Sequence, residues 1–229
     1  SATFDSSNNK VVISYDDTGN STYGTAIVGT VSGTGISFGS AVVFESASSI
    51  YTSATFDSSN NKVIIAYQDG GNSSYGTVIE GTVSGTSISF GSAIVFESDS
   101  SFDISANFDS NANKIVIAYK DGGNSNYGSG IVFSPLSSST NITSENFIGF
   151  AQDTVADGQP VTINTKGAIA DNIPQIPSAS SSLGTAVSFE SATTSRIASC
   201  FDSTNNRIVV SYVDSGSDDD GTVAVGTVS

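Results

Sequence analysis

The chain repeats a pattern of 52 residues, and this repeat restricts the fold more than any other feature of the sequence. FDSSNNK begins at Phe4 and again at Phe56, FDSNANK begins at Phe108, and FDSTNNR begins at Phe201. The steps are 52, 52 and 93 residues, so the third unit carries 41 additional residues. A repeat of this length indicates similar supersecondary units that bury their apolar faces against one another.

Each unit contains four strand-like runs separated by turn sequences. The turns, such as DSSNN, DGGNSS and SGT, are rich in residues that tolerate left-handed backbone or cap their own main chain. Short strands joined by tight turns predict an antiparallel four-stranded sheet in each unit, and no window shows a helical period. In the second unit the runs are TSATFD (52–57), KVIIAYQD (62–69), YGTVIEGTVSG (75–85) and SISFGSAIVFE (87–97).

The second run of each unit indicates how the sheets are arranged. Its four versions, VVISY, VIIAY, IVIAY and IVVSY, are apolar or small on both faces, which predicts a strand covered on both sides. Small sheets pressed between neighbouring sheets would provide that cover. We therefore predict an all-β fold, a β-propeller-like array of about four antiparallel four-stranded blades, with a stacked array of sheets as the alternative.

The repeat also predicts the organisation of the chain as a single repeat domain. The last unit stops in its third run, so its fourth strand is expected to be absent or to come from sequence beyond Ser229 or from another subunit. Because methionine is absent, we expect Ser1 to be a processed end or the edge of a fragment. The predicted blades span 1–52, 53–104, 105–195 and 196–229, and the insertion 134–182 is predicted to form a small β subdomain within blade three.

Composition excludes several classes of function. The chain has 22 acidic and 7 basic residues, a formal net charge of −15, and such a surface repels nucleic acid and anionic lipid. It has no histidine and a single cysteine, Cys200, which excludes histidine-based catalysis, a Cys/His nucleophile and a zinc cluster. No apolar run approaches the ~18 residues that span a bilayer. We expect no enzyme, no nucleic-acid binding and no membrane insertion.

The turns between the second and third runs are the best candidates for a binding site. Asp, Asn and main-chain carbonyls on a Gly-rich turn are oxygen ligands of the kind that calcium prefers. The alternative is an Asx turn, in which the Asp side chain caps its own backbone. The predicted calcium ligands, the only cofactor expected, are Asp16, Asp69, Asp121, Asp214, Asp218 and Asp220.

Tyrosines and carboxylates recur elsewhere in the repeat. Tyr23, Tyr75 and Tyr127 begin the third run and would stack on sugar rings if exposed, or pack against the blade if buried. Cys200 is expected to be a partly covered, unreactive thiol. Glu45, Glu97 and Glu190 occupy one equivalent position and are interpreted as solvated charges at strand ends, whereas Glu80 and Glu145 have no equivalent and no visible partner.

Units of the form FDSSNNK…SYGTAIVGTVSGTSISFG, followed by ENFIGFA…DGQPVTINTKGAIADN, resemble the repeats of virion-associated proteins of marine bacteriophages, often described as tail-fibre or structural proteins. The resemblance covers nearly the whole chain. The fourth unit departs from the pattern, because YVDSGSDDDGT replaces YQDGGNSSYGT. The resemblance implies a structural role at a virion surface and host attachment.

We therefore predict a non-enzymatic virion or extracellular surface protein, a phage tail-fibre or decoration-type module that contacts host-surface glycan or a partner subunit. Its expected partners are other copies of itself or other virion or surface proteins. The alternative is a secreted or cell-surface adhesin, filament subunit or lectin of a marine bacterium.

Overall fold

The computed structural model of the chain describes residues 1–135, 150–151, 163–164 and 181–228. The chain divides into two compact units, Ser1–Leu136 with Ser181–Ser229, and Ser137–Ser180. Among the described residues the only helical segment is a short 3-10 turn, η1 (Thr18–Asn20). Every strand pairing is antiparallel, so the prediction of an all-β antiparallel fold is confirmed.

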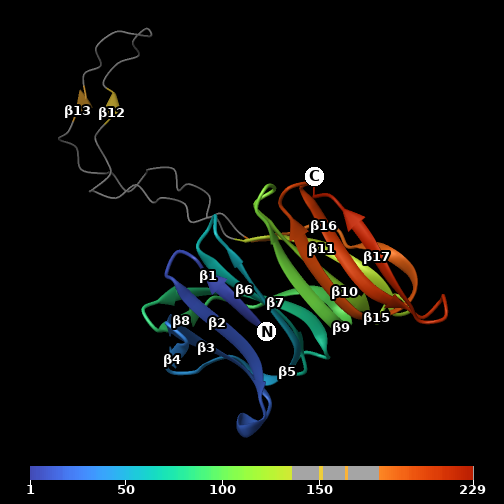
Figure 1. Cartoon of the computed structure of the whole chain (residues 1–229), viewed down its shortest axis with the longest axis horizontal. Helices are drawn as coiled ribbons and strands as arrows, with labels where there is room; N and C mark the ends of the chain where they lie inside the picture. The colour runs from blue at the N-terminus through green and yellow to red at the C-terminus, as the bar shows by residue number, and fades with distance from the viewer. Residues whose placement is uncertain (136–149, 152–162, 165–180, 229) are drawn as a thin grey trace. The chain divides into compact units, whose positions relative to one another are not determined.

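Fifteen strands of the first unit form one sheet (Figure 1). The strands of the first repeat and the junction to the second are β1 (Ala2–Asp5), β2 (Lys10–Asp17), β3 (Tyr23–Ser32), β4 (Gly35–Phe38) and β5 (Val42–Asp57). The second repeat and its junction to the third contain β6 (Lys62–Asp69), β7 (Tyr75–Ser84), β8 (Ser87–Phe90) and β9 (Ile94–Asp109). The remaining strands are β10 (Lys114–Asp121), β11 (Tyr127–Ser134), β14 (Ser182–Leu183), β15 (Val187–Asp202), β16 (Arg207–Asp214) and β17 (Asp220–Gly226).

Three strands of 16 residues, β5, β9 and β15, join one repeat to the next. The first half of β5 pairs with β3 and its second half pairs with β6, with a change of register between Ile50 and Ser53. Tyr51 lies at this bulge with a φ of 54°, and Asp103 and Arg196 are its left-handed equivalents in β9 and β15. The predicted boundary between residues 52 and 53 therefore falls inside a continuous strand.

The long strands divide the sheet into four segments, which we number I to IV. Segment I contains β1 to β4 and the first half of β5, and segment II contains the second half of β5, β6 to β8 and the first half of β9. Segment III contains the second half of β9, β10, β11, β14 and the first half of β15, and segment IV contains the second half of β15, β16 and β17.

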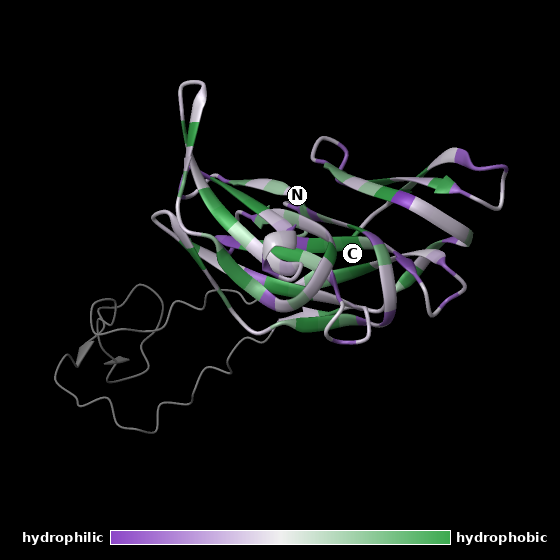
Figure 2. Cartoon of the chain, turned by 90° about the horizontal axis from the view of Figure 1, so that it is seen from below, coloured by the Kyte–Doolittle hydropathy of each residue, from purple (hydrophilic) through white to green (hydrophobic). Residues whose placement is uncertain are grey.

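Consecutive segments pack face to face through apolar side chains. In β6, Val63 and Ile65 belong to the core shared with segment I, whereas Ile64 and Ala66 belong to the core shared with segment III. A third core joins segments III and IV. Figure 2 shows the resulting pattern, with apolar residues along the strands and hydrophilic residues gathered at turns. Burying an Ile side chain contributes about 1.5–3 kcal/mol, so these interfaces dominate the stability of the array.

The predicted burial of the second run on both faces is confirmed for the inner repeats only. Every residue of VIIAY (63–67) in β6 is buried, and four of the five in IVIAY (115–119) are. In β2 only Val12 and Ser14 of VVISY (11–15) are buried, and in β16 Val209 and Ser211 face away from the core. Segments I and IV therefore each leave one face uncovered among the described residues.

Over the described residues the sheet is open, so the predicted propeller-like array is not a closed propeller. Within the described residues, β1 and β17 are edge strands and are not hydrogen-bonded to each other. The last predicted run of each unit is also divided. In the second repeat, β8 pairs with the end of β7, and β9 begins at Ile94 and pairs with the beginning of β7. In the part of the chain that the structure describes, segment IV has no equivalent of these two strands.

In the third repeat, β14 pairs with the end of β11 in the register in which the end of β8 pairs with β7. Phe133 takes the place of Gly29 and Gly81 and is fully buried, while Leu183 of β14 pairs opposite it. Within the second unit, the two-residue strands β12 (Phe150–Ala151) and β13 (Ile163–Asn164) pair antiparallel. The remainder of the predicted β subdomain (134–182) lies outside the described residues, apart from its two ends.

Serine hydroxyls connect the segments along their first strands. The Oγ atoms of Ser1, Ser53 and Ser105 occupy equivalent positions, and each accepts a hydrogen bond from a main-chain N–H of the following segment. The donors are Ala54, Ala106 and Ser199, at distances of 2.9–3.0 Å. Ala198 occupies the equivalent position in segment IV, so the fourth repeat does not carry the hydroxyl.

Candidate functional site

Four equivalent hairpins, 17–23, 69–75, 121–127 and 214–220, join the second and third strands of the segments. In each, the first residue is an aspartate and lies opposite the last residue, as Asp69 lies opposite Tyr75. Two consecutive residues of each turn have left-handed backbone, for example Ser73 and Ser74 with φ of 57° and 64°. Ser, Thr, Asn and Asp fill these positions, and short polar side chains are among those that tolerate this conformation.

The first aspartate of each hairpin caps its own turn. Asp69 Oδ1 accepts a 2.9 Å hydrogen bond from the Gly71 N–H, and Asp121 Oδ1 accepts from the N–H groups of Gly123 and Asn124. Asp214 does the same with Gly216. The Asx turn that the sequence offered as the alternative to a metal site is therefore formed in these hairpins.

In the first hairpin the capping residue is Asp17 and not Asp16. Asp17 Oδ1 accepts from the Gly19 N–H at 3.0 Å, and Asp17 precedes Asp69 by one repeat. Asp16 instead corresponds to Gln68, whose buried amide donates a 2.7 Å hydrogen bond to the Ser101 carbonyl. The repeat distance alone identifies Asp17, because Asp69 minus 52 residues falls on it.

The fourth hairpin concentrates acidic residues. Asp214 and Asp220 face each other across the strand pair, and Asp218 and Asp219 occupy the two left-handed positions. Asp220 replaces the tyrosine of the other hairpins. Within the described ranges, no group of three or more His, Cys, Asp or Glu side chains is arranged to hold a metal ion. Calcium binding by these aspartates remains a prediction.

Tyr23, Tyr75 and Tyr127 lie at the same position of segments I, II and III. All three are half-buried, so each ring packs against its segment and keeps part of its surface toward solvent. Their partners across the neighbouring strand are small residues, Ser48, Ser100 and Thr193. The row of tyrosines thus presents one partly open aromatic side chain for each of three segments.

The recurring glutamates have a role that the sequence did not indicate. Glu45, Glu97 and Glu190 are half-buried and each accepts a hydrogen bond from a tyrosine hydroxyl of the following segment. Their interpretation as solvated strand-end charges is therefore wrong. The donors are Tyr67, Tyr119 and Tyr212, at 3.3, 2.9 and 3.0 Å, and every pair is separated by 22 residues.

Burial and the adjacent carboxylates shift ionisation in these pairs. Desolvation, followed by the charges of Glu45 and Asp69, raises the pKa of Tyr67 well above its ordinary value. The pKa of Tyr119 is also raised, mainly by desolvation and next by the charge of Glu97. The pKa of Tyr212 is raised to about 12 by desolvation and by Glu190. Desolvation also raises the pKa of Glu45.

Two further expectations are corrected by the structure. Glu80, predicted to have no visible partner, accepts a 2.9 Å hydrogen bond from the Ser181 hydroxyl, where the chain returns from the insertion. Glu145 lies outside the described residues. Cys200 is exposed rather than partly covered.

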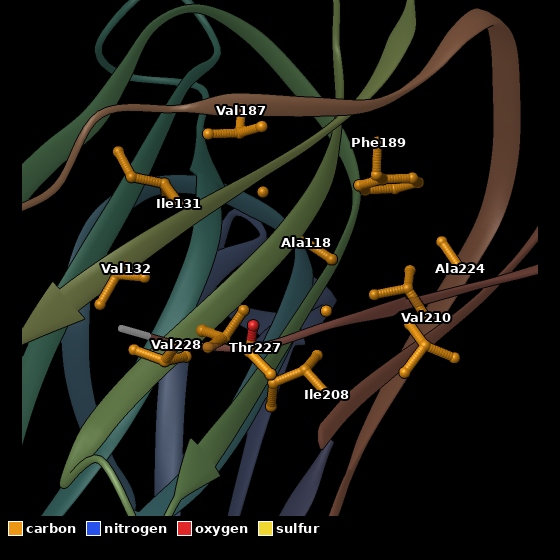
Figure 3. Close-up of a pocket in the computed structure, with 14 residues that line it drawn as sticks. Ala118, Ile131, Val132, Val187, Phe189, Ile208, Val210, Ala224, Thr227 and Val228 are labelled. Atoms are coloured by element: carbon orange, nitrogen blue, oxygen red, sulfur yellow. The ribbon is translucent and has the colours of Figure 1, made fainter. Parts of the chain in front are cut away.

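An apolar pocket of about 190 Å³ lies between segments III and IV (Figure 3). In this view Val132, Thr227 and Val228 lie along one side of the opening, and Phe189, Val210 and Ala224 along the other. No sequence motif pointed to this pocket, because it is formed by residues of five strands.

Comparison with known proteins gives no match to a protein-family model and none to a curated protein sequence. Over the described ranges, no helix has the length and apolar character that crossing a bilayer requires.

Proposed function

We propose that the chain is a non-enzymatic structural module of a virion or extracellular surface. Its contact surface for host glycan or a partner protein is formed by the three hairpins that carry a tyrosine, 17–23, 69–75 and 121–127. The observation that carries this proposal is the repetition of one hairpin, with the same left-handed turn and a half-open tyrosine, in three consecutive segments. Weak contacts repeated on one scaffold gain strength when a repetitive ligand engages several of them at once.

The partly open rings suit a carbohydrate contact. A tyrosine presents an apolar face for a sugar ring and a hydroxyl for its polar edge. The net charge of −15 favours neutral or cationic surface ligands over anionic ones. In this proposal segments I to IV are the blades of the array, about four in number, and they hold the hairpins at fixed spacing.

A glycan array tests the contact. We expect saturable binding that is lost when Tyr23, Tyr75 and Tyr127 are all replaced by alanine, with circular dichroism to verify that the fold is retained. Tyr51→Ala serves as the control, since Tyr51 is an exposed tyrosine outside the hairpins. Equal binding by the triple variant would exclude the tyrosines as the contact, and absence of any binding would leave a protein partner as the target.

A reading frame placed beside virion genes would support the phage assignment.

A filament subunit or adhesin is the second candidate, and it is favoured by the outer edges of β1 and β17, which pair with no other described strand. Unpaired strand edges are templates for pairing with other chains. Light scattering and negative-stain microscopy over a concentration series test this function. Growth into fibres would favour it over the tail-fibre or decoration role.

A further inference from the structure

Among the strands that the structure describes, none covers the outer edge of β17, whereas the equivalent edge is covered in the three other repeats. Strand β3 pairs with β4 and β5, β7 with β8 and β9, and β11 with β14 and β15. Among the described residues, β17 pairs only with β16. Its free main-chain groups can therefore pair with an extended polypeptide.

One glycine of β17 lies at a position where, in the other repeats, an aromatic ring covers the strand. In the second repeat, a Cβ on Gly76 would lie 2.5 Å from the ring of Phe96, so only glycine allows that ring to cover the strand. Gly24 has the same relationship to Phe44, at 2.4 Å. The equivalent residue of β17 is Gly221, and nothing lies within 4 Å of the position that its Cβ would take.

A second glycine marks the other face of the same edge. Gly81 lies beneath Ile88 and Phe90 of β8, whose side chains fill the space between segments II and I. The equivalent residue of β17 is Gly226, which again has nothing within 4 Å of its Cβ position. Gly226 lines the apolar pocket between segments IV and III. The pocket therefore lies where the side chains of a β8-like strand would pack.

We propose that the edge of β17 is a binding site for an extended peptide strand with the pattern of residues 87–98, SISFGSAIVFES. The first apolar pair of such a strand fills the pocket beside Gly226, and its second phenylalanine covers Gly221. The ligand is an extended, aromatic and apolar β-strand of the type that β8 and the first half of β9 provide in the second repeat. The two glycines are independent observations, since they open onto opposite faces of the strand. This inference does not depend on the proposed glycan contact.

Binding of a synthetic peptide tests the proposal. The probe is a fluorescent peptide of residues 86–99, TSISFGSAIVFESD, with two added lysines for solubility, and fluorescence anisotropy reports its binding to the full 229-residue chain. We expect saturable binding in the micromolar range, weakened at least tenfold when both phenylalanines of the peptide are alanine. Absence of saturable binding, or equal binding of the alanine peptide, would overturn the proposal.

Variants of the chain locate the site. Gly221→Val places a side chain where the second phenylalanine of the peptide would lie, and we expect it to reduce affinity at least tenfold. Gly35→Val is the matched control, because Gly35 lies in β4 at an open position far from β17 in the strand order. Unchanged affinity of a folded Gly221→Val chain would also overturn the proposal.

Hydrogen exchange provides a readout that does not depend on any variant. The peptide should slow the exchange of β17 amides in the unmodified chain, because a new strand would protect them. Protection elsewhere without protection of β17 would contradict the assignment. If the chain associates with itself, the peptide should reduce this self-association by occupying the β17 edge. Self-association that the peptide does not change would count against the site.

Discussion

The hydroxyl of Tyr119 donates a 2.9 Å hydrogen bond to the carboxylate of Glu97, which lies in the preceding segment. The Tyr119 ring is fully buried and packs edge-on against Phe96, with ring centroids 5.2 Å apart. Tyr119 thus contacts the preceding segment through both its hydroxyl and its ring. The same pair recurs as Tyr67 with Glu45 and Tyr212 with Glu190.

Tyr119→Phe should lower the free energy of unfolding by about 1–2 kcal/mol, because it removes a hydrogen bond to a charged acceptor while keeping the ring. In a double-mutant cycle with Glu97→Gln, a coupling energy of about 1 kcal/mol is expected from urea unfolding. Tyr15→Phe is the control, since Tyr15 is the equivalent residue of segment I and its hydroxyl donates no such hydrogen bond to a described glutamate. An equal loss in the control would show that the effect is not due to the glutamate.

Stability should fall as pH rises above about 10. The folded-state pKa values of Tyr67 and Tyr119 lie above their unfolded value, so both tyrosines bind protons more tightly in the folded chain. Their contribution is complete below the unfolded pKa and decreases above it, by up to about 1.4 kcal/mol per pH unit for each group. Urea unfolding between pH 8 and 11.5 measures the slope. The Tyr67→Phe, Tyr119→Phe double variant should show a shallower slope, and an unchanged slope would contradict this origin.

Ser53→Ala should cost about 1–2 kcal/mol, because the Ala106 N–H loses its acceptor in a partly buried position. Thermal or urea unfolding measures the change. The control is Ser87→Ala, an exposed serine of β8, which should change stability by less than about 0.5 kcal/mol. A neutral Ser53→Ala would mean that water replaces the hydroxyl between the segments.

Gly76→Ala and Gly221→Ala form a matched pair. The new methyl group at residue 76 would meet the Phe96 ring at 2.5 Å, so we expect a loss of about 1–3 kcal/mol from overpacking. At residue 221 nothing lies within 4 Å, and the change should stay within about 0.5 kcal/mol. The unfolding midpoints of the two variants measure this difference. Equal loss of stability in both would refute the claim that Phe96 requires a glycine beneath its ring.

Calcium binding by the hairpin aspartates predicts that a chelator lowers the melting temperature by several degrees, since an ion bound only to the folded chain stabilises it. Differential scanning calorimetry with EDTA and then with excess Ca²⁺ tests this. Replacement of Asp214, Asp218 and Asp220 by asparagine should remove part of the shift if the fourth hairpin holds an ion. The absence of any shift would leave the aspartates with the turn-capping role alone.

Several features of the fold were readable from local patterns. Alternation and turn residues predict the strands because side chains in a strand alternate between two faces and tight turns require left-handed backbone. The sequence VIIAY predicts burial on both faces, and β6 has it. The nearly identical VVISY does not, because its exposure depends on whether another segment covers segment I, and local sequence carries no record of that.

The pairing of Glu97 with Tyr119 could have been inferred from their constant separation of 22 residues in three repeats, but only if the stacking of segments had been assumed. The exchange of glycine for phenylalanine at residue 133 was likewise visible as a break in the repeat. Its consequence was not, because the burial of Phe133 depends on contacts with residues far along the chain, such as Leu183 of β14.

By itself the sequence determined the repeat, the strands, the turns and the antiparallel all-β class, since each depends on interactions between residues close along the chain. Only the tertiary structure decided that hydroxyls link successive segments and that, over the described residues, the sheet is open and two glycines of β17 have no atom near their Cβ positions. These features depend on contacts between residues far apart in the chain. Identical local sequences therefore acquire different environments according to their place in the stack.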